Sequence, residues 1–259
     1  MRFSANLGFL FSNRPLPERV KAAAKAGFDA VECHFPYDTP LTDLKAALAE
    51  TGLTMLGLNT APGNVEAGDF GLCAITGREA EAHAAIDQAI DYGAKIGAAN
   101  IHVMAGRTDG GREAEDTYRA NLSYACDRAA EYGMNILIEP INQRDVPGYH
   151  LSHVEPAAEL IAALGHSNLK LMFDCYHTQI MQGDLTERLC RHMPVIGHIQ
   201  IAAVPDRSEP DMGEVHFINL LAAICDMGFI GPVGAEYKPR GGSTEASLGW
   251  LETFRRELK

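Results

Sequence analysis

The sequence predicts an α/β protein built as a single (β/α)8 barrel, the TIM-barrel fold, in which residues 1–259 form one domain. The length of 259 residues is close to the roughly 250 of one closed barrel of this kind. Short apolar runs alternate with longer segments of helical periodicity, which is typical of parallel strands joined by helices. Eight such units can be counted, and the expected strands are residues 3–11, 30–35, 54–60, 100–105, 135–141, 170–175, 197–202 and 233–237.

Helix ends can be recognised between the first strands. Apolar residues recur at helical spacing over residues 16–24, and Gly27 follows them with the freedom to adopt the left-handed turn that closes a helix. Thr39 and Pro40 indicate the N-cap and the first residue of the next helix, which should end near Gly52. End signals therefore support the same alternation that the periodicity indicates.

Later parts of the chain carry signals of a helix start and of long loops. Ser152 and Glu155 have the spacing of a capping box. The longest loops, residues 61–77 and 203–214, follow the third and seventh strands. In this fold the loops that follow strands surround the active site, so we expect these two to act as walls or lids.

Composition and charge limit the classes of function. Hydrophobic residues make up 46% of the chain, and no apolar run reaches the ~18 residues that a membrane helix needs. The first residues do not resemble a secretory signal, so we expect a cytoplasmic protein without a membrane segment. The formal net charge of −12 disfavours nucleic acid as a partner, because affinity for nucleic acid depends mainly on cations that meet phosphates.

Signals for cofactors and assembly are few. The six cysteines are scattered without a C-x-x-C pair, so neither a zinc knuckle nor a disulfide framework is indicated. No glycine-rich dinucleotide fingerprint is present, and we expect no nucleotide cofactor. Barrels often associate through their outer helices, which leaves a homo-oligomer open as an interpretation.

Polar side chains stand at the ends of four consecutive apolar strands. Glu139, Asp174 and Glu236 come late in the fifth, sixth and eighth strands, and Gln200 takes the matching place in the seventh. A carboxylate buried in such a strand is costly unless it is paired or binds a metal, and we expect Lys238 to be the one cation embedded near these strands. Separate structural ion pairs are the alternative to one shared divalent cation. All-oxygen ligation favours Mg²⁺ or Mn²⁺ over Zn²⁺.

Six phrases spread along nearly the whole chain are similar to those of a known family. They are N-T-A-P-G at 59–63, H-V-M-A-G at 102–106, I-E-P-I-N at 138–142, F-D-x-Y-H at 173–177, G-H-I-Q-I-A at 197–202 and E-Y-x-P at 236–239. Together they make the chain resemble the hydroxypyruvate isomerase family of the xylose-isomerase-like barrels. The resemblance implies that Glu139, Asp174, Gln200 and Glu236 bind the metal, and that Glu139 and Glu236 are also the catalytic residues that exchange the substrate's proton.

The activity that this resemblance implies is the isomerisation of a small hydroxy-keto acid, hydroxypyruvate, to tartronate semialdehyde. Such a reaction removes a proton beside a carbonyl, passes through an enediolate and returns a proton to the neighbouring carbon, for which two opposed carboxylates and a Lewis acid suffice. A 2-oxo-tetronate isomerase or a ketose 3-epimerase would use the same site, although such epimerases commonly have histidine where Gln200 stands. An endonuclease of this barrel type would need many histidines and a basic surface. A catalytically inactive binding barrel would leave the acid cluster without a reason.

The carboxylate of a hydroxy-keto acid needs a cation or several donors. Lys238 lies two residues after Glu236, so in an extended segment both side chains point toward the barrel mouth, with a lid salt bridge as the alternative. Arg207, in the loop after the seventh strand, is either a second such cation or a solvated loop charge. His177 is expected to contact a substrate hydroxyl or to tune a glutamate. His102 is either a substrate contact or a satisfied core residue.

Two further histidines lie on these strands. His34, near the end of the second strand, has the same two interpretations as His102. His198 shares a strand face with Gln200 one layer deeper, and we expect it to hydrogen-bond a metal ligand from below.

Overall fold

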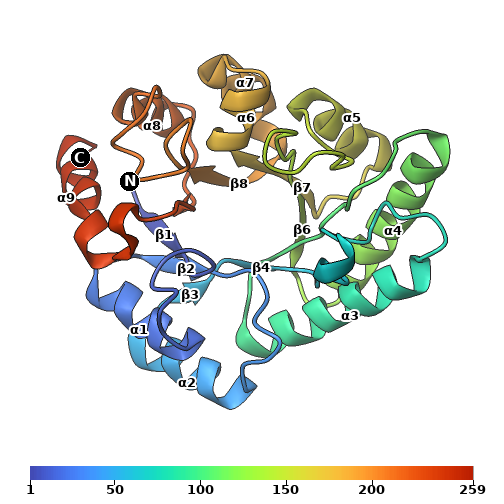
Figure 1. The fold of residues 1–259 in the computed structure, drawn as a ribbon, viewed down its shortest axis with the longest axis horizontal. Helices are drawn as coiled ribbons and strands as arrows, with labels where there is room; N and C mark the ends of the chain where they lie inside the picture. Colours follow the sequence, from blue (N-terminus) through green and yellow to red (C-terminus); the bar gives the residue numbers. More distant parts are fainter. Residues whose placement is uncertain (259) are drawn as a thin grey trace.

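Parallel strands form the centre of the computed structural model, which describes residues 1–258 (Figure 1). Helices surround the strands, as Figure 1 shows in a view down the shortest axis of the molecule. Adjacent strands pair in the order β3-β2-β1-β9-β8-β7-β6-β5-β4, and every pair is parallel. This arrangement confirms the predicted barrel. The strands are β1 (Phe3–Asn6), β2 (Ala30–Glu32), β3 (Thr54–Met55), β4 (Gly57–Asn59), β5 (Asn100–His102), β6 (Asn135–Ile138), β7 (Leu169–Asp174), β8 (Ile196–Ile201) and β9 (Val233–Ala235).

The third predicted strand, residues 54–60, is divided into β3 and β4 at Leu56. β3 pairs with β2, and β4 pairs with β5. Hydrogen bonds continue across the division, because the backbone N–H of Leu56 donates to the carbonyl of Val31 at 2.7 Å, and that of Cys33 donates to the carbonyl of Gly57 at 3.1 Å. Eight predicted strands therefore appear as nine segments without opening the barrel.

The helices follow the strands in the predicted alternation. Gly27 has a φ of 89° after the first helix, and Gly52 has a φ of 69° after the second, so both take the left-handed conformation expected of a closing glycine. The helices are α1 (Leu16–Lys25), α2 (Leu41–Thr51), α3 (Glu79–Ile96), α4 (Arg112–Ala130), α5 (Val154–Leu164), α6 (Cys175–Met181), α7 (Leu185–His192), α8 (Phe217–Asp226) and α9 (Gly249–Glu257), with single 3₁₀ turns at η1 (Val65–Ala67), η2 (Met193–Val195), η3 (Arg240–Gly242) and η4 (Glu245–Ser247). None of the helices in this described part of the chain is long and apolar enough to cross a membrane.

Two predicted helix starts are wrong. Pro40, with a ψ of 129°, is itself the N-cap of α2, so the helix begins at Leu41 and Thr39 lies outside it. The capping box at Ser152 does not form, because the extended backbone of His153 takes the cap position of α5 without a side-chain hydrogen bond. Ser152 Oγ instead bonds to His153 Nδ1, and Glu155 contacts side chains of later elements.

The first strand ends earlier than predicted. Residues 7–11 form turns, because the side chain of Asn6 accepts the backbone N–H of Gly8 at 2.9 Å and the carbonyl of Asn6 accepts that of Leu10 at 2.9 Å. An asparagine that bonds its own backbone in this way offers the chain an alternative to the strand. The turn carries Phe9 toward the mouth of the barrel, where it contacts the site described below.

The barrel closes where the two ends of the chain meet, and Figure 1 places both termini on this side. β1 pairs with β9, with Phe3 opposite Val233. Trp250 of α9 is fully buried beneath this seam, its ring edge-on to Phe3 at 5.3 Å between centroids. Its Nε1 donates to the hydroxyl of Tyr237 at 3.2 Å. The last helix is thus fastened to the first strand by aromatic packing and one buried hydrogen bond.

Replacing Tyr237 by phenylalanine should lower the free energy of unfolding by about 1–3 kcal/mol. The change removes the hydroxyl that bonds Ser247 Oγ at 2.7 Å and leaves the buried N–H of Trp250 without its acceptor. Denaturant unfolding followed by circular dichroism measures the loss. Tyr132→Phe is the matched control. Tyr132 is 49% exposed, so this change should alter the free energy of unfolding by less than about 0.5 kcal/mol. Equal losses in the two variants would contradict this account of the seam.

Candidate active site

The four predicted metal ligands lie at one end of the barrel. Asp174 is the last residue of β7, Gln200 lies in β8, and Glu139 and Glu236 directly follow β6 and β9. Strand register places Asp174 beside Gln200 and Gln200 beside Gly234, two residues before Glu236. All four side chains are buried. The structure therefore brings together the residues that the strand-end pattern singled out.

Three buried oxygens in this group have no hydrogen-bond partner among residues 1–258. They are Oε1 of Glu139, Oδ2 of Asp174 and Oε1 of Gln200. A buried acceptor without a partner costs about 1–3 kcal/mol, so three of them together indicate a missing positive group. Carboxylate and amide oxygens are the ligands that Mg²⁺ and Mn²⁺ prefer, and the donor set fits such a cation.

His177 lies within the same group. One ligand atom from each of Glu139, Asp174 and His177 can be chosen so that all three lie within 4.8 Å of one another, which is compatible with a divalent metal. The ring, however, accepts the backbone N–H of Asn142 at Nδ1, at 3.3 Å, and the side-chain amide of Asn142 lies 2.6 Å from the same atom. Burial lowers the pKa of His177 well below its ordinary value, so the ring is neutral. Its proton therefore sits on Nε2, which lies 3.6 Å from Asp174 Oδ2, a distance longer than a hydrogen bond.

Arg207 is the cation nearest to the carboxylates. Its side chain is only 14% exposed, and Nη2 lies 2.9 Å from Oε2 of Glu236 and 3.5 Å from Oδ2 of Asp174. The guanidinium carbon lies 5.0 Å from the ring centre of Phe9 and 4.9 Å from that of Tyr176. The expectation that Lys238 is the one embedded cation is therefore wrong, and so is the interpretation of Arg207 as a solvated loop charge.

The backbone of Arg207 explains how a loop residue reaches this position. Its φ of 57° is left-handed, which is uncommon for a residue with a side chain. Its N–H donates to the carbonyl of Ala203, and its carbonyl accepts the N–H of Lys238 at 2.7 Å. The loop after β8 is thus tied to the segment after β9, and the side chain is directed inward.

The pKa values of the two predicted catalytic glutamates are shifted in opposite directions. Burial, together with the charges of Glu236 and Asp174, raises the pKa of Glu139 well above its ordinary value. Burial acts in the same direction on Glu236, but Arg207 and His34 outweigh it and lower the pKa of Glu236. His34 Nε2 lies 2.9 Å from Oε1 of Glu236. The surroundings of the two carboxyl groups therefore favour a proton on Glu139 and ionisation of Glu236.

The remaining predicted substrate residues lie at different depths. Lys238 is exposed at the mouth, with Nζ 5.7 Å from the ring centre of Phe9, and forms no ion pair within residues 1–258. The predicted alternative of a lid salt bridge is thus not seen in this part of the chain. His102 is buried, and its Nδ1 lies 3.7 Å from Oε2 of Glu139. Burial lowers the pKa of His102 to about 3, so the ring is neutral.

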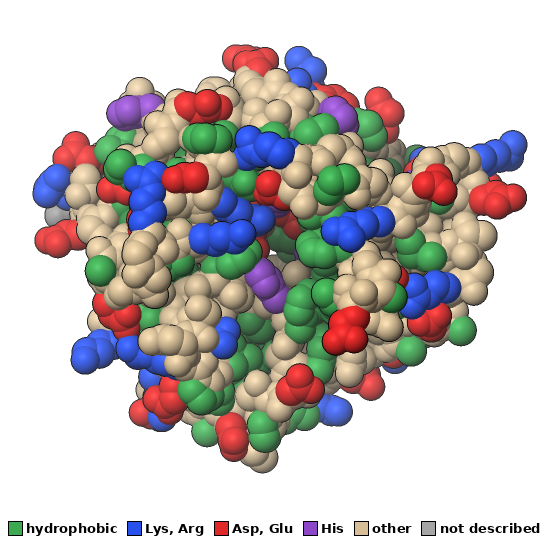
Figure 2. Space-filling model, in the orientation of Figure 1, with side chains coloured by type: hydrophobic (Ala, Val, Ile, Leu, Met, Phe, Trp, Pro, Cys, Tyr) green, Lys and Arg blue, Asp and Glu red, His purple; other side chains and the backbone are tan. Residues whose placement is uncertain are grey.

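A cavity of about 210 Å³ leads from the mouth to these groups, lined on its apolar side by Phe9, Phe35, Phe70, Met104, Ile141 and Val146. Figure 2 shows a hollow at the centre of this face, with a histidine visible inside and Lys and Arg side chains around the rim. The loops that follow the strands supply exposed cations to this end, namely Arg107, Arg144, Lys238 and Arg240. Arg144 pairs with Asp145 and Arg240 pairs with Asp206 of these loops, whereas Arg107 and Lys238 form no ion pair within residues 1–258.

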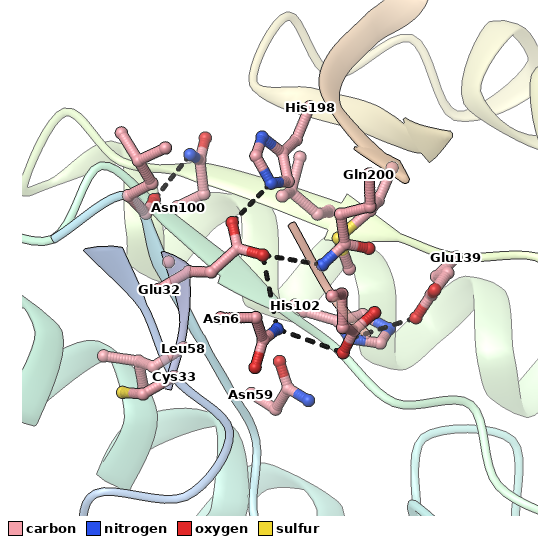
Figure 3. A pocket seen from close by; sticks show the side chains of 15 residues that line it. Asn6, Glu32, Cys33, Leu58, Asn59, Asn100, His102, Glu139, His198 and Gln200 are labelled. Atoms are coloured by element: carbon pink, nitrogen blue, oxygen red, sulfur yellow. Dashed lines mark hydrogen bonds and ion pairs between the residues drawn. The ribbon is translucent and has the colours of Figure 1, made fainter. Parts of the chain in front are cut away.

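Two residues of the site were not anticipated from the sequence. Glu32, the last residue of β2, and Asn6, the last of β1, are buried, and they contact Gln200 and Glu236 respectively (Figure 3). Glu32 ends an apolar strand, and Glu139 directly follows one. The pattern that predicted Glu139 therefore also predicts Glu32 as a site residue. His198 was expected to bond a metal ligand, but its Nε2 lies 2.5 Å from Oε2 of Glu32 instead.

Comparison with known proteins gives consistent matches over nearly the whole chain. The family model described as xylose isomerase-like TIM barrel matches residues 20–254. A 2-oxo-tetronate isomerase from Cupriavidus necator is 44% identical, and the match covers 98% of this chain and 98% of that protein. The hydroxypyruvate isomerase of Escherichia coli is 39% identical, and the match covers 98% of this chain and 100% of that protein. The crystal structure of an AP endonuclease, family 2, from Brucella melitensis has a TM-score of 0.94 at 39% identity and covers 97% of this chain and 98% of its own.

Proposed function

The chain belongs to the xylose isomerase-like TIM barrel family, and from this membership we propose that it is a metal-dependent isomerase of small hydroxy-keto acids that interconverts hydroxypyruvate and tartronate semialdehyde. One observation carries the proposal: four strand ends bring three acids and an amide together, and three of their buried oxygens have no hydrogen-bond partner in the part of the chain that the structure describes. The names of the relatives agree with it, since both isomerases match nearly the full chain.

Glu139, Asp174, Gln200 and Glu236 would hold the divalent cation, with Mg²⁺ or Mn²⁺ favoured by the oxygen ligands. When bound, the cation supplies positive charge to the substrate oxygens on which negative charge develops. His177 is left out of the ligand set because its Nε2 carries a proton. It is placed to donate that hydrogen to a substrate oxygen, in keeping with the role expected from the sequence.

The proton movements can be assigned to the two glutamates. For hydroxypyruvate, one carboxylate takes a proton from C3, the electron pair of that C–H bond forms the enediolate, and the opposite carboxyl group gives a proton to C2. The hydroxyl hydrogen passes from O3 to O2, so that the product is tartronate semialdehyde and no redox partner is consumed. Arg207, 2.9 Å from Glu236, favours the ionised form of that carboxyl group, which suits Glu236 to the removal of the proton and leaves its return to Glu139.

The carboxylate of the substrate would meet the cations at the entrance. Arg207 faces the acids from the inner side, and Lys238 lies at the mouth without an ion pair to another part of residues 1–258. Both stand against Phe9, which keeps water from one side of the guanidinium. This arrangement favours an acid over a neutral sugar.

Other activities are less well supported. A 2-oxo-tetronate isomerase is the second candidate, because the relative of that name from Cupriavidus necator is 44% identical and the cavity has room for a four-carbon acid. A ketose 3-epimerase is disfavoured by Gln200, and an endonuclease by the net charge of −12, although one similar structure carries that name. We also propose that the protein works in the cytoplasm as one domain without a nucleotide cofactor.

The test is proton NMR in D₂O with chelator-stripped protein, before and after addition of Mg²⁺ or Mn²⁺. Hydroxypyruvate and 2-oxo-tetronate are supplied separately. We expect metal-dependent appearance of tartronate semialdehyde with deuterium at the exchanging carbon. Conversion of the four-carbon acid alone would assign the second candidate, and exchange without conversion would keep the chemistry but reject both substrates. Absence of exchange with every metal and substrate would overturn the proposed function.

A further inference from the structure

Glu32 is a buried carboxylate that the proposed reaction does not use. It is 4% exposed and lies at the end of β2, across the barrel from β8. Its Oε1 accepts hydrogen bonds from two amide side chains, Gln200 Nε2 at 2.9 Å and Asn6 Nδ2 at 3.2 Å. Its Oε2 faces His198 Nε2 and the hydroxyl of Ser4. The carboxylate is thus the centre of a network that includes Asn6, His198 and Gln200 (Figure 3).

An ionised carboxylate only accepts hydrogen bonds, and this fixes which way each amide faces. The nitrogen of Gln200 must point to Glu32, so its Oε1 is turned to the opposite side. Figure 3 shows this arrangement, with the nitrogen of Gln200 toward Glu32 and the oxygen on the side where Glu139 is drawn. That oxygen is one of the three buried acceptors of the acid cluster that have no hydrogen-bond partner among the described residues, 1–258.

Asn6 is oriented by the same carboxylate. Its Nδ2 donates to Glu32 and also to Oε1 of Glu236 at 3.0 Å, while its Oδ1 accepts the backbone N–H of Gly8. With the oxygen held by that N–H, both hydrogens of the amide face carboxylates. Glu32 therefore connects, through one amide each, to two of the four proposed ligands.

Gly234 leaves the space that this network needs. A Cβ at this position would lie 2.6 Å from Oε1 of Glu32, 2.9 Å from Cγ of Gln200 and 2.9 Å from Nε2 of His198. Contacts this short force side chains to shift. The absence of a side chain at 234 thus preserves the contact between Glu32 and Gln200, which is an observation independent of the hydrogen bonds.

We propose that Glu32 is a positioning residue that turns the amide of Gln200 so that its oxygen faces the metal site, and that holds Asn6 against Glu236. The inference rests on the proposed function only in that Gln200 and Glu236 are taken as metal ligands. Glu32 touches neither the substrate nor the cation. It acts by excluding the wrong orientation of an amide whose two ends have nearly the same shape.

Mn²⁺ binding to the chelator-stripped chain, measured by calorimetry, is the first readout. We expect Glu32→Gln to weaken Mn²⁺ binding about 10- to 100-fold, because a glutamine at 32 can donate as well as accept and no longer fixes the amide of Gln200. Ser4→Ala is the matched control, since it removes a contact to the other oxygen of Glu32 and should leave binding within about 2-fold. Glu32→Gln also removes a negative charge near the metal site, and the effect of that charge on Mn²⁺ binding must be separated from the effect of a misoriented Gln200 amide.

A double-mutant cycle makes that separation. If Glu32 acts through Gln200, then Glu32→Gln should weaken Mn²⁺ binding only slightly in a chain that already carries Gln200→Ala. An equal loss of Mn²⁺ affinity in the wild-type and Gln200→Ala chains would overturn the proposal. Gly234→Ala disturbs the network without changing its charge and should weaken Mn²⁺ binding, whereas Gly57→Ala, whose Cβ would meet Asn100 at an ordinary 3.4 Å, should not. Unchanged binding in Gly234→Ala would likewise contradict it.

A second readout needs no metal. In ¹⁵N-labelled protein, the side-chain NH₂ signals of Gln200 and Asn6, assigned with Gln200→Ala and Asn6→Ala, should exchange slowly with water and should shift and exchange faster in Glu32→Gln. Unchanged signals would overturn the positioning role whatever the metal result. A wild-type chain that binds no Mn²⁺ but shows the signal changes would overturn the proposed function and leave Glu32 as the residue that orients the amides.

Discussion

Replacing Glu139 by glutamine is expected to reduce kcat about 10³-fold or more while the barrel remains folded. Glutamine keeps the shape of the side chain but can neither take up the substrate's proton nor contribute negative charge to the metal site. Turnover of hydroxypyruvate at saturating Mn²⁺ gives kcat, and circular dichroism verifies the fold. The effect is large because Glu139 would have two functions, whereas most buried residues have one.

Glu209→Gln is the matched control for this loss. Glu209 is also a buried glutamate, 8% exposed, and it accepts the backbone N–H of Arg240 in the loop region outside the acid cluster. Its replacement should change kcat less than about 3-fold. Deuterium exchange sharpens the result: a Glu139→Gln variant that still exchanges the proton at C3 without forming product would assign proton removal to Glu236. Full activity in Glu139→Gln would exclude it from the reaction.

Replacing Arg207 by methionine should lower kcat/KM for hydroxypyruvate by about 10²-fold or more. The variant leaves Glu236 and Asp174 without the cation that lies 2.9 Å and 3.5 Å from them, and truncating one partner of a buried charge pair typically costs about 2–5 kcal/mol. Methionine retains the unbranched apolar stem of the side chain without its charged end, and its left-handed backbone is no more strained than that of arginine. Arg207→Lys keeps the charge but not the planar fork, so it should recover only part of the loss.

Lys238→Met provides the comparison for Arg207. Lys238 is exposed, so loss of its charge should raise KM about 10-fold or less and leave kcat nearly unchanged. Inhibition of the reaction by dihydroxyacetone, a neutral sugar with the same number of carbons, should be insensitive to this change. If Lys238→Met affected acids and neutral sugars equally, Lys238 would not bind the carboxylate, and if Arg207→Met were fully active, the buried ion pairs would have no part in the reaction.

The strand-end acids could be predicted from the sequence because they depend on local pattern and fold class alone. Once apolar runs are assigned to parallel strands of a barrel, the residues that end those runs must meet at one rim, and Glu139, Asp174, Gln200 and Glu236 do. Helix periodicity was equally reliable, since Gly27 and Gly52 close helices where expected.

Other features depend on contacts between distant segments, and no local pattern contains them. The burial of Arg207 follows from a left-handed residue in a loop that is tied to the backbone of Lys238. The end of the first strand follows from two hydrogen bonds that Asn6 accepts, one at its side chain and one at its carbonyl. Glu32 could have been predicted from the strand-end pattern. Its role could not, because that role depends on amide side chains of β1 and β8, which only the closed barrel brings next to Glu32.

The pairing of β1 with β9 also makes folding of the barrel depend on two segments that lie far apart in the chain. Until Val233–Ala235 pairs with it, β1 exposes unpaired backbone groups along one edge, and the acid cluster lacks Glu236. Contacts between such distant segments form slowly, because the entropy of closing a long loop is lost before the contacts give anything in return. Closure of the barrel therefore removes an edge that is prone to aggregation and completes the acid cluster in the same folding step.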